Sequence, residues 1–384
     1  MSFKFYQFHF RGRGWGVVEW GYSAEQTSVV ETIEKKGLKC ACAGQSTIFS
    51  FVLSMLALEV VNVSARGVPR NQSMKTVHSL EEMRTISKPL HLALGVFDGV
   101  HLGHQAVIRE AVEAVKKTGG LAGVLTFDPH PIQVLAPKKA PRRILASIQH
   151  KEDLLADLGV DVLVVIPFTE EFAQQEADVF LSEMVSYCPE LKTLTMGEDW
   201  KFGHRRLGDV ALLKRFGAEH GVEVRTAESI RLEGERVSST RIRQAIRDGN
   251  LHAVEEMLGR AFSVWGTVIK GRKLGRTIGF PTANLRVYNE QLPPDGVWVV
   301  EVILEHDQIY RGAGNLGVRP TVEGENGHRQ LEVYLLDFSG DLYGCEMEVK
   351  FLEFVRGEVK FDSLDELKGQ ILKDVTFCRN WSIK

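Results

Sequence analysis

The chain has 384 residues, of which 44% are hydrophobic and 25% charged, as is ordinary for a globular protein of two or three domains. Its 47 basic and 50 acidic residues give a net charge of −3, which offers no electrostatic basis for binding nucleic acid or an anionic membrane. No zinc-type spacing links the five cysteines, which we interpret as reduced thiols of a cytoplasmic protein.

Residues 1–73 differ in character from the rest of the chain, and Phe3–Trp20 shows no clear helical or strand period. The apolar run Ile48–Leu58 is shorter than the roughly 20 residues that span a bilayer, and it begins too late for a signal peptide. Ordinary folded sequence begins at Met74. We therefore expect residues 1–73 to be an extension of unknown role, and we hypothesise that a misplaced start codon makes it non-native.

From residue 90 onward, buried strands alternate with amphipathic helices. Apolar runs typical of parallel strands stand at Leu90–Phe97, Leu121–Phe127, Val162–Ile166 and Leu191–Met196. Helical spacing and closing glycines predict helices over Val107–Val115, Lys151–Leu158 and Thr240–Asp248. This alternation predicts a doubly wound α/β domain.

After about residue 260 the pattern changes to short β-strands. Val297–Leu304 and Leu331–Phe338 are rich in β-forming residues, and Cys345–Phe351 alternates apolar with charged side chains, the period of a half-buried strand. These segments predict a small antiparallel barrel or sandwich. One helix closes the chain, with Ser363 and Glu366 as its capping box.

The first motif with chemical content is Gly95–His104, with the sequence GVFDGVHLGH. It stands where a predicted strand turns into a helix, at the edge where open α/β sheets bind ligands. Free N–H groups of the helix start attract anions. His101 and His104 share one face and can donate hydrogen bonds to phosphoryl oxygens, while the glycines let a nucleotide approach the backbone. The other residues of this motif that we predict to bind ATP are Gly95, Phe97, Asp98, Gly99 and Gly103.

Three further segments agree with this site. Thr126–Pro131 ends the next predicted strand at the same sheet edge, and Gly197–Gly203 follows a later strand. Val237–Arg243 opens a helix whose hydroxyl and N–H groups suit a phosphate, which Arg243 can clamp bidentately. The sequence contains neither a P-loop nor a dinucleotide-binding glycine fingerprint after the first strand. The hydroxyls expected to bind phosphate are those of Ser238, Ser239 and Thr240.

Together these segments resemble the nucleotidyltransferase module of prokaryotic FAD synthetases, part of the HxGH adenylyltransferase superfamily, over about residues 76–258. The resemblance implies ATP as the adenylyl donor and FMN as the acceptor. The implied residues are His101, His104 and Arg243 as catalytic stabilisers of the triphosphate, Ser239 and Thr240 as its holders, and Asp199 and Phe202 as flavin contacts.

A second motif, Gly271–Asn284, has the sequence GRKLGRTIGFPTAN. Its glycines and cations form a flexible basic loop that can wrap a polyphosphate through backbone N–H groups. Thr282 and Asn284 offer neutral oxygens two residues apart, which suits Mg²⁺ because this ion takes a few oxygen ligands together with water and phosphate. The loop residues that we predict to bind ATP are Gly271, Arg272, Lys273, Gly275 and Arg276.

This motif, with Asn315–Thr321 and Leu331–Phe338 after it, resembles riboflavin kinase over about residues 260–384. The resemblance implies a compact six-stranded barrel. It also implies that Glu332 is the general base that takes the proton from the ribityl 5′-hydroxyl. The implied flavin contacts are Arg356, Glu358 and Phe361.

The two resemblances together predict an FMN adenylyltransferase domain at 74–258 and a riboflavin kinase domain at 259–384. Such an enzyme phosphorylates riboflavin to FMN and then adenylylates FMN to FAD, with ATP as co-substrate and Mg²⁺ in each reaction. The expected partners are riboflavin, FMN and ATP, without nucleic acid or membrane.

Three alternatives remain open. One activity alone could be kept, since Asp199 and Trp200 stand where the family often has Asn-Phe, and Tyr334 stands where it usually has His. A sensor could use both folds only to bind flavin or nucleotide, although the histidines and Glu332 argue for catalysis. A nucleotide could also be transferred to another acceptor, against which the kinase-like barrel argues.

Overall fold

The computed structural model describes residues 74–140, 144–271, 274–288, 290–305, 308–318 and 329–382, together with strands β1 (Lys4–His9) and β2 (Trp15–Trp20). The chain divides into two units, Met1–Val68 and Pro69–Lys384. In the first unit, β1 and β2 pair antiparallel, a strand pair that the sequence pattern did not reveal. The remainder of the predicted extension 1–73 lies outside the described residues.

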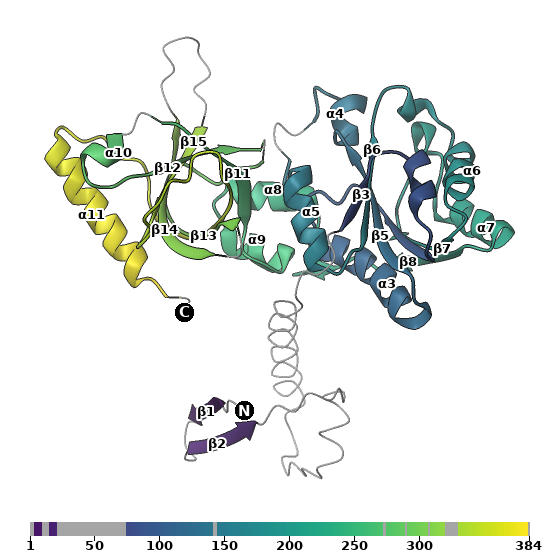
Figure 1. The fold of residues 1–384 in the computed structure, drawn as a ribbon, viewed down its shortest axis with the longest axis horizontal. Coiled ribbons are helices and arrows are strands. Elements are labelled where there is room, and N and C mark those ends of the chain that lie inside the picture. The colour runs from purple at the N-terminus through teal and green to yellow at the C-terminus, as the bar shows by residue number, and fades with distance from the viewer. Residues whose placement is uncertain are drawn as a thin grey trace. The chain divides into compact units, whose positions relative to one another are not determined.

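The α/β part of the second unit is built on a parallel sheet of six strands (Figure 1). Their order is β3-β6-β5-β4-β7-β8, and every pairing between neighbours is parallel, as the doubly wound fold requires. The strands are β3 (Lys75–Val77), β4 (Leu90–Leu94), β5 (Leu121–Asp128), β6 (Val162–Pro167), β7 (Leu191–Gly197) and β8 (Glu223–Ala227). A two-stranded ribbon follows, made of β9 (Arg231–Leu232) and β10 (Glu235–Arg236).

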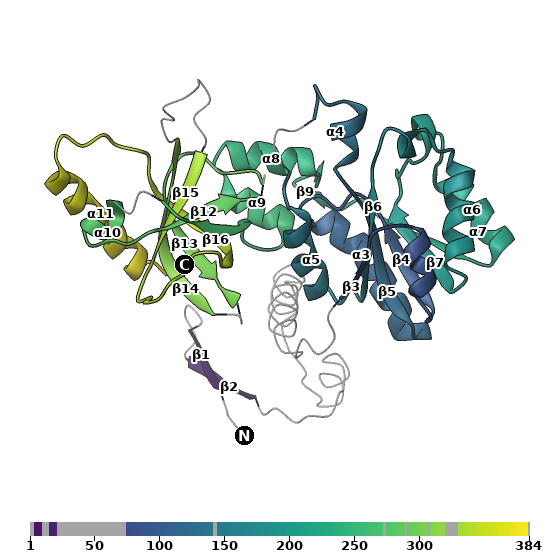
Figure 2. The ribbon, with the colours of Figure 1, turned by 45° about the horizontal axis from the view of Figure 1, so that its top comes forward.

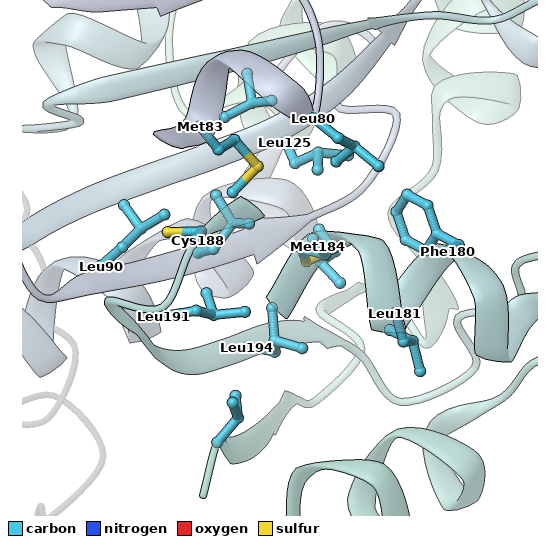
Figure 3. Packing of buried hydrophobic residues seen from close by; sticks show 14 of the residues in the cluster. Leu80, Met83, Leu90, Leu125, Phe180, Leu181, Met184, Cys188, Leu191 and Leu194 are labelled. Atoms are coloured by element: carbon cyan, nitrogen blue, oxygen red, sulfur yellow. The ribbon is translucent and has the colours of Figure 1, made fainter. Parts of the chain in front are cut away.

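Helices cover both faces of this sheet, and the side chains of successive strand residues pack into hydrophobic cores on opposite faces. Leu92 and Leu94 belong to one buried cluster, while Ala93 between them belongs to another. Figure 3 shows the first cluster, in which leucines of the sheet pack with Phe180, Leu181 and other residues of α6. The helices are α3 (Leu102–Thr118), α4 (Pro131–Leu135), α5 (Ile148–Asp157), α6 (Ala177–Tyr187), α7 (Val210–His220), α8 (Ser239–Arg247) and α9 (Leu251–Leu258), with 3₁₀ turns η1 (Glu81–Thr85), η2 (Phe172–Gln174) and η3 (His204–Arg206).

Two of the element boundaries that differ from those predicted have a clear local cause. The first strand ends at Leu94 and not at Phe97, because Phe97 has a φ of 50° and belongs to the turn into α3. Helix α5 begins at Ile148, three residues before the predicted start, because Ser147 caps it by accepting a hydrogen bond from the His150 N–H at 3.3 Å.

The C-terminal part is a closed antiparallel barrel with the strand order β11-β12-β15-β14-β13-β16 (Figure 2). The structure thus decides between the barrel and the sandwich that the sequence left open, and it confirms the six-stranded barrel that the resemblance implied. The elements are β11 (Ser263–Ile269), α10 (Leu274–Thr277), β12 (Ala283–Val287), β13 (Gly296–Ile303), β14 (Ile309–Val318), β15 (Arg329–Leu335), β16 (Glu346–Arg356) and α11 (Leu364–Asn380).

One hydrophobic core is shared between α8, α9 and the barrel. It unites Ile242 and Ile246 of α8 with Trp298 and Val300 of β13, all of them buried. Figures 1 and 2 both show α8 and α9 between the sheet and the barrel. The last two helices of the predicted first domain therefore bury their apolar faces against the second domain.

The described part of the chain contains no helix that is long and apolar enough to cross a membrane. Its three cysteines, Cys188, Cys345 and Cys378, are free thiols, as the sequence indicated. Cys40 and Cys42 lie outside the described residues.

Helix α11 is attached to the barrel by a buried carboxylate. Asp374 is 5% exposed and accepts three hydrogen bonds from the guanidinium of Arg356, at 2.7–3.1 Å. At the start of the helix, Ser363 accepts from the Glu366 N–H at 3.2 Å, as the capping box predicted. The Glu366 carboxylate, however, accepts from Asp362 and not from Ser363.

We expect Asp374→Ala to lower the free energy of unfolding of the barrel by about 3 kcal/mol, because it leaves the Arg356 charge without its buried partner. Denaturant unfolding followed by tryptophan fluorescence measures the change. Asp337→Ala is the matched control, since Asp337 pairs with Arg379 of the same helix at an exposed position. Equal melting temperatures for the two variants would contradict this role of Asp374.

Candidate functional site

The two histidines of the first motif lie against each other at the start of α3. His101 is the N-cap residue, and its Nδ1 accepts a hydrogen bond from the His104 N–H at 3.3 Å. The two imidazole rings stack with centroids 3.5 Å apart. Because Nδ1 of His101 is an acceptor, its Nε2 carries the proton in the neutral ring and can donate to a ligand.

The other residues predicted from this motif shape the loop. Phe97 is 1% exposed and meets the His104 ring edge to face, with centroids 5.4 Å apart. Gly99 has a φ of +80°, and a Cβ there would lie 2.8 Å from the Cβ of Leu145. Gly95 and Gly103 are similarly confined by Phe97 and His101. Each of these contacts is internal to the protein, so ligand binding by these residues stays a prediction.

Asp98 joins this loop to α8. Its buried carboxylate forms an ion pair with Arg243, and its Oδ1 accepts hydrogen bonds from the N–H groups of Leu145 at 2.8 Å and Ala146 at 3.3 Å. The hydroxyl of Ser239 donates to the Asp98 carbonyl oxygen at 3.0 Å. The structure therefore brings the first motif and the start of α8 together, as expected from the suitability of both segments for binding phosphate.

At the start of α8, Ser238 is the N-cap and accepts a hydrogen bond from the Arg241 N–H at 3.3 Å. Thr240 is exposed. Arg243 is 8% exposed and is engaged with Asp98, although its Nε has no partner among the described residues.

A cavity of about 110 Å³ opens at the carboxyl ends of β4 and β5. Lys151, which the sequence analysis used only to mark a helix, lines this cavity. It is buried and donates through Nζ to the Val96 carbonyl oxygen at 3.1 Å. Burial lowers the pKa of Lys151, against the opposing effect of Asp98 and Asp128. The only signal in the sequence is its place on the apolar face of α5, three residues after Ile148 and four before Leu155. The cavity is lined by Val96, Asp98, Phe127, Asp128, His130, Gln133, Ile144, Ala146, Ile148 and Lys151.

The two flavin contacts implied for this domain have different surroundings. Asp199 is exposed and forms an ion pair with Arg236. Phe202 is 8% exposed and belongs to the core of the sheet. The ring stacked on it is that of Trp200, with centroids 4.6 Å apart, and Trp200 is only partly buried.

In the barrel, the structure brings together Glu332, Thr282 and Asn284. The hydroxyl of Thr282 donates to Oε2 of Glu332 at 3.3 Å. Asn284 of β12 lies opposite Glu332 of β15 in the antiparallel register, and its Oδ1 accepts a hydrogen bond from Gln330 at 2.9 Å. The three polar side chains of Thr282, Asn284 and Glu332 therefore lie together where β12 pairs with β15.

The basic loop passes close to this group. A Cβ at Gly271 would collide with the side-chain amide of Asn284, and one at Gly275 would collide with the Phe280 carbonyl oxygen. Arg276 is exposed. The two remaining predicted phosphate ligands, Arg272 and Lys273, lie outside the described residues.

The three flavin contacts implied for the barrel lie near one another. Arg356 places its guanidinium 5.9 Å from the ring centroid of Phe361. Glu358 occupies the space where a side chain at Gly317 would otherwise lie. Since Arg356 already binds Asp374, its first role in this structure is to hold α11.

Comparison with known proteins identifies both domains. Residues 83–241 match the family model of FAD synthetase, and residues 258–382 match that of riboflavin kinase. The bifunctional riboflavin kinase/FMN adenylyltransferase of Haemophilus influenzae is 40% identical over 303 residues, which cover 79% of this chain and 97% of that protein. The Escherichia coli K12 protein of the same name is 40% identical over 290 residues, covering 76% of this chain and 92% of that protein.

The chain belongs to the bifunctional riboflavin kinase/FMN adenylyltransferase family. Both resemblances seen in the sequence are confirmed, and with them a role in FMN and FAD biosynthesis. A solved structure from Streptococcus pneumoniae, described as a macrolide-efflux protein, has 33% sequence identity and a TM-score of 0.69, covering 81% of this chain and 100% of that one. It supports the fold.

In this member of the family, both imidazoles of the adenylyltransferase motif are neutral at physiological pH. Burial lowers the pKa of His101 to about 4, and burial lowers the pKa of His104 well below its usual range. Between pH 6.5 and 4 the unfolded chain therefore binds a proton at His101 that the folded chain excludes. The free energy of unfolding accordingly falls as the pH drops through this window.

We expect His101 to titrate near pH 4 instead of its ordinary value of 6.5, because charging a buried imidazole is costly. NMR of the histidine ring protons across pH 3.5–8 measures the midpoint, and His101→Asn assigns the signal. A His101 midpoint above 6 would contradict the neutral-imidazole description.

Proposed function

We propose that the barrel site phosphorylates riboflavin and that the sheet-edge site adenylylates the FMN product. ATP is the co-substrate at both. The observation that carries this assignment is the presence of two separately built polar sites in one chain, one around His101 and Asp98 and the other around Thr282, Asn284 and Glu332.

At the sheet edge, an oxygen of the FMN phosphate attacks the α-phosphorus of ATP, and pyrophosphate leaves as the bond to the bridging oxygen breaks. The Nε2–H of His101 donates to phosphoryl oxygens as their charge grows, and His104 acts beside it. Such donors are effective in a buried site because little water competes for them. Arg243, with the N-terminal hydroxyls of α8, binds the triphosphate, and we assign flavin contacts to Asp199 and Phe202.

Lys151 adds a positive charge to this site. A lysine ammonium has three donors, of which the described residues occupy two, with Val96 at 3.1 Å and the Thr126 hydroxyl at 3.4 Å. We propose that the third donates to a phosphoryl oxygen of a substrate in the cavity. A substrate phosphate also compensates the cost of burying the ammonium.

At the barrel site, Glu332 accepts the proton of the riboflavin 5′-hydroxyl while the oxygen bonds to the γ-phosphorus and ADP leaves. The basic loop from Gly271 to Arg276 binds the polyphosphate through backbone N–H groups. Arg356, Glu358 and Phe361 are the proposed flavin contacts.

The side-chain oxygens of Thr282 and Asn284 fit Mg²⁺ as ligands. A hydroxyl and an amide oxygen beside a carboxylate are the type of ligand this ion takes along with phosphate and water. When bound, Mg²⁺ neutralises charge on the phosphates of ATP.

We place the two domains at 74–258 and 259–384, which is supported by the matched segments 83–241 and 258–382. Residues 1–73 precede both matched segments, which supports their description as an extension. The free thiols of Cys188, Cys345 and Cys378 support a cytoplasmic location, and the net charge of −3 supports an enzyme that binds neither nucleic acid nor membrane.

Two substitutions separate the activities in a time course with riboflavin, ATP and Mg²⁺, followed by flavin chromatography. For the wild-type chain we expect FMN first and FAD after it. Glu332→Gln should lower FMN formation by at least about 100-fold, because the base is lost, and should spare FAD formation from supplied FMN. His104→Ala should do the reverse. Loss of both activities from either substitution would contradict two separate sites.

Lys151→Met tests the buried ammonium with an apolar side chain of similar length. We expect kcat/KM for FMN adenylylation to fall about 100-fold, with an unchanged or higher melting temperature, because a buried charge is removed. Riboflavin phosphorylation should be unaffected. Lys192→Met, at an exposed lysine, is the matched control. Retention of adenylylation by Lys151→Met would refute the proposed contact.

A further inference from the structure

The carboxylate of Glu290 connects the barrel to the sheet domain. Glu290 follows β12 and is 0% exposed. Its Oε1 accepts hydrogen bonds from the N–H and the hydroxyl of Ser147, both at 2.7 Å, and lies 3.1 Å from Nδ1 of His150. Its Oε2 accepts from the Trp265 N–H at 2.9 Å. Since Ser147 and His150 begin α5 whereas Trp265 belongs to β11, one buried carboxylate is shared by both domains.

This arrangement fixes the positions of the groups it joins. A buried carboxylate is strongly disfavoured unless donors surround it, so Glu290 and its donors hold each other in place. The backbone adds a second connection at the same point, because the Gln291 N–H donates to the Ile144 carbonyl oxygen at 2.7 Å and Ile144 pairs with Glu290 in a parallel β-bridge. The segment 144–147 is thereby bound along the barrel.

The same segment supports the adenylyl site. Leu145 and Ala146 donate their N–H groups to Asp98, and the Leu145 side chain lies beneath Gly99. Asp98 in turn binds Arg243 and, through its carbonyl oxygen, Ser239 at the start of α8. A continuous series of contacts therefore runs from the barrel to the residues proposed to bind ATP.

The linker between the domains adds to this support. Arg260 of the linker is partly buried and donates to the carbonyl oxygens of Gly99 at 2.9 Å and Val100 at 3.1 Å. These two residues belong to the loop that precedes His101. Arg260 therefore fixes the backbone of this loop, while the segment 144–147 fixes its Asp98 carboxylate.

We propose that Glu290 is a positioning residue for FMN adenylylation, acting from the kinase barrel through Ser147 and Asp98. The inference rests on the proposed function of the sheet-edge site. In a transfer reaction that depends on alignment, a displacement of about 1 Å can lower the rate about 100-fold. The barrel is then a structural component of the adenylyl site as well as the site of phosphorylation.

The test uses the full chain with Glu290→Gln, which keeps the side-chain size but presents an NH₂ group to the donors around it. We expect kcat for FMN adenylylation to fall at least about tenfold with little change in the KM values. We also expect kcat/KM for riboflavin phosphorylation to stay within about twofold, because alignment at the barrel site does not depend on Ser147. A purely structural role would lower the melting temperature without this separation between the activities or between kcat and KM.

Ser147→Ala provides a second, milder variant, since it removes the hydroxyl that donates to Glu290 and caps α5, and leaves the backbone contact to Glu290. It should lower kcat for FMN adenylylation several-fold. The double variant should have no lower kcat than Glu290→Gln alone, because both changes break the same contact between Glu290 and Ser147. Glu301→Gln is the matched control. It alters a half-buried carboxylate of β13 that pairs with Lys350 at 3.4 Å, away from Ser147, and should leave both activities unchanged.

Three results would overturn the proposal: unchanged adenylylation in Glu290→Gln and Ser147→Ala, equal losses in both activities, or full additivity in the double variant. A wild-type chain that makes FMN but no FAD would overturn the proposed function of the sheet-edge site, and this inference with it. A wild-type chain that makes FAD, together with unaffected variants, would overturn this inference alone.

Discussion

The carboxylate of Asp98 is the point on which the sheet-edge site depends. It is buried, and a buried charge must be met by donors that the chain brings to it. Those donors come from Arg243 of α8 and from the N–H groups of Leu145 and Ala146 before α5, far apart in the sequence. Meeting this one charge therefore fixes the relative positions of the histidine loop, the start of α8 and the segment before α5. The site is assembled by the same contacts that make the burial of Asp98 tolerable.

The barrel obtains its site by a different route, through strand register. Antiparallel pairing of β12 with β15 sets Asn284 opposite Glu332, and β14 brings Asn315 opposite the same residue. A register slip of one residue would turn Glu332 into the barrel core, where Leu331 and Val333 now lie. Closure of the barrel leaves no free edge along which such a slip could occur, so its hydrogen bonding protects the geometry of the site.

The two sites differ in burial, which is greater at the sheet edge. At the sheet edge it keeps both imidazoles neutral and lowers the pKa of Lys151, which fits the proposal that the site uses oriented donors and a buried charge compensated by substrate phosphate. In the barrel, Glu332 remains partly exposed and shares its carboxylate with the Thr282 hydroxyl. The sheet-edge reaction needs charge stabilisation without a base from the protein, because the FMN phosphate is already an anion. The barrel reaction starts from a neutral hydroxyl and needs a base.

The sequence by itself determined the α/β character of the first domain, the β character of the second, four strands of the parallel sheet and the two motifs. Apolar periodicity is local, and parallel strands place their carboxyl ends at one edge, so Gly95–His104 and Thr126–Pro131 could be assigned to one sheet edge without coordinates. Tertiary structure alone decided the burial and the hydrogen-bond partners of Lys151 and Glu290, and the engagement of Arg356 by Asp374. Lys151 is one lysine on a helix, and Glu290 meets Ser147 across 143 residues of chain. No local pattern distinguishes such residues from solvated charges, because what defines them is the desolvation and pairing that appear only when distant segments pack together.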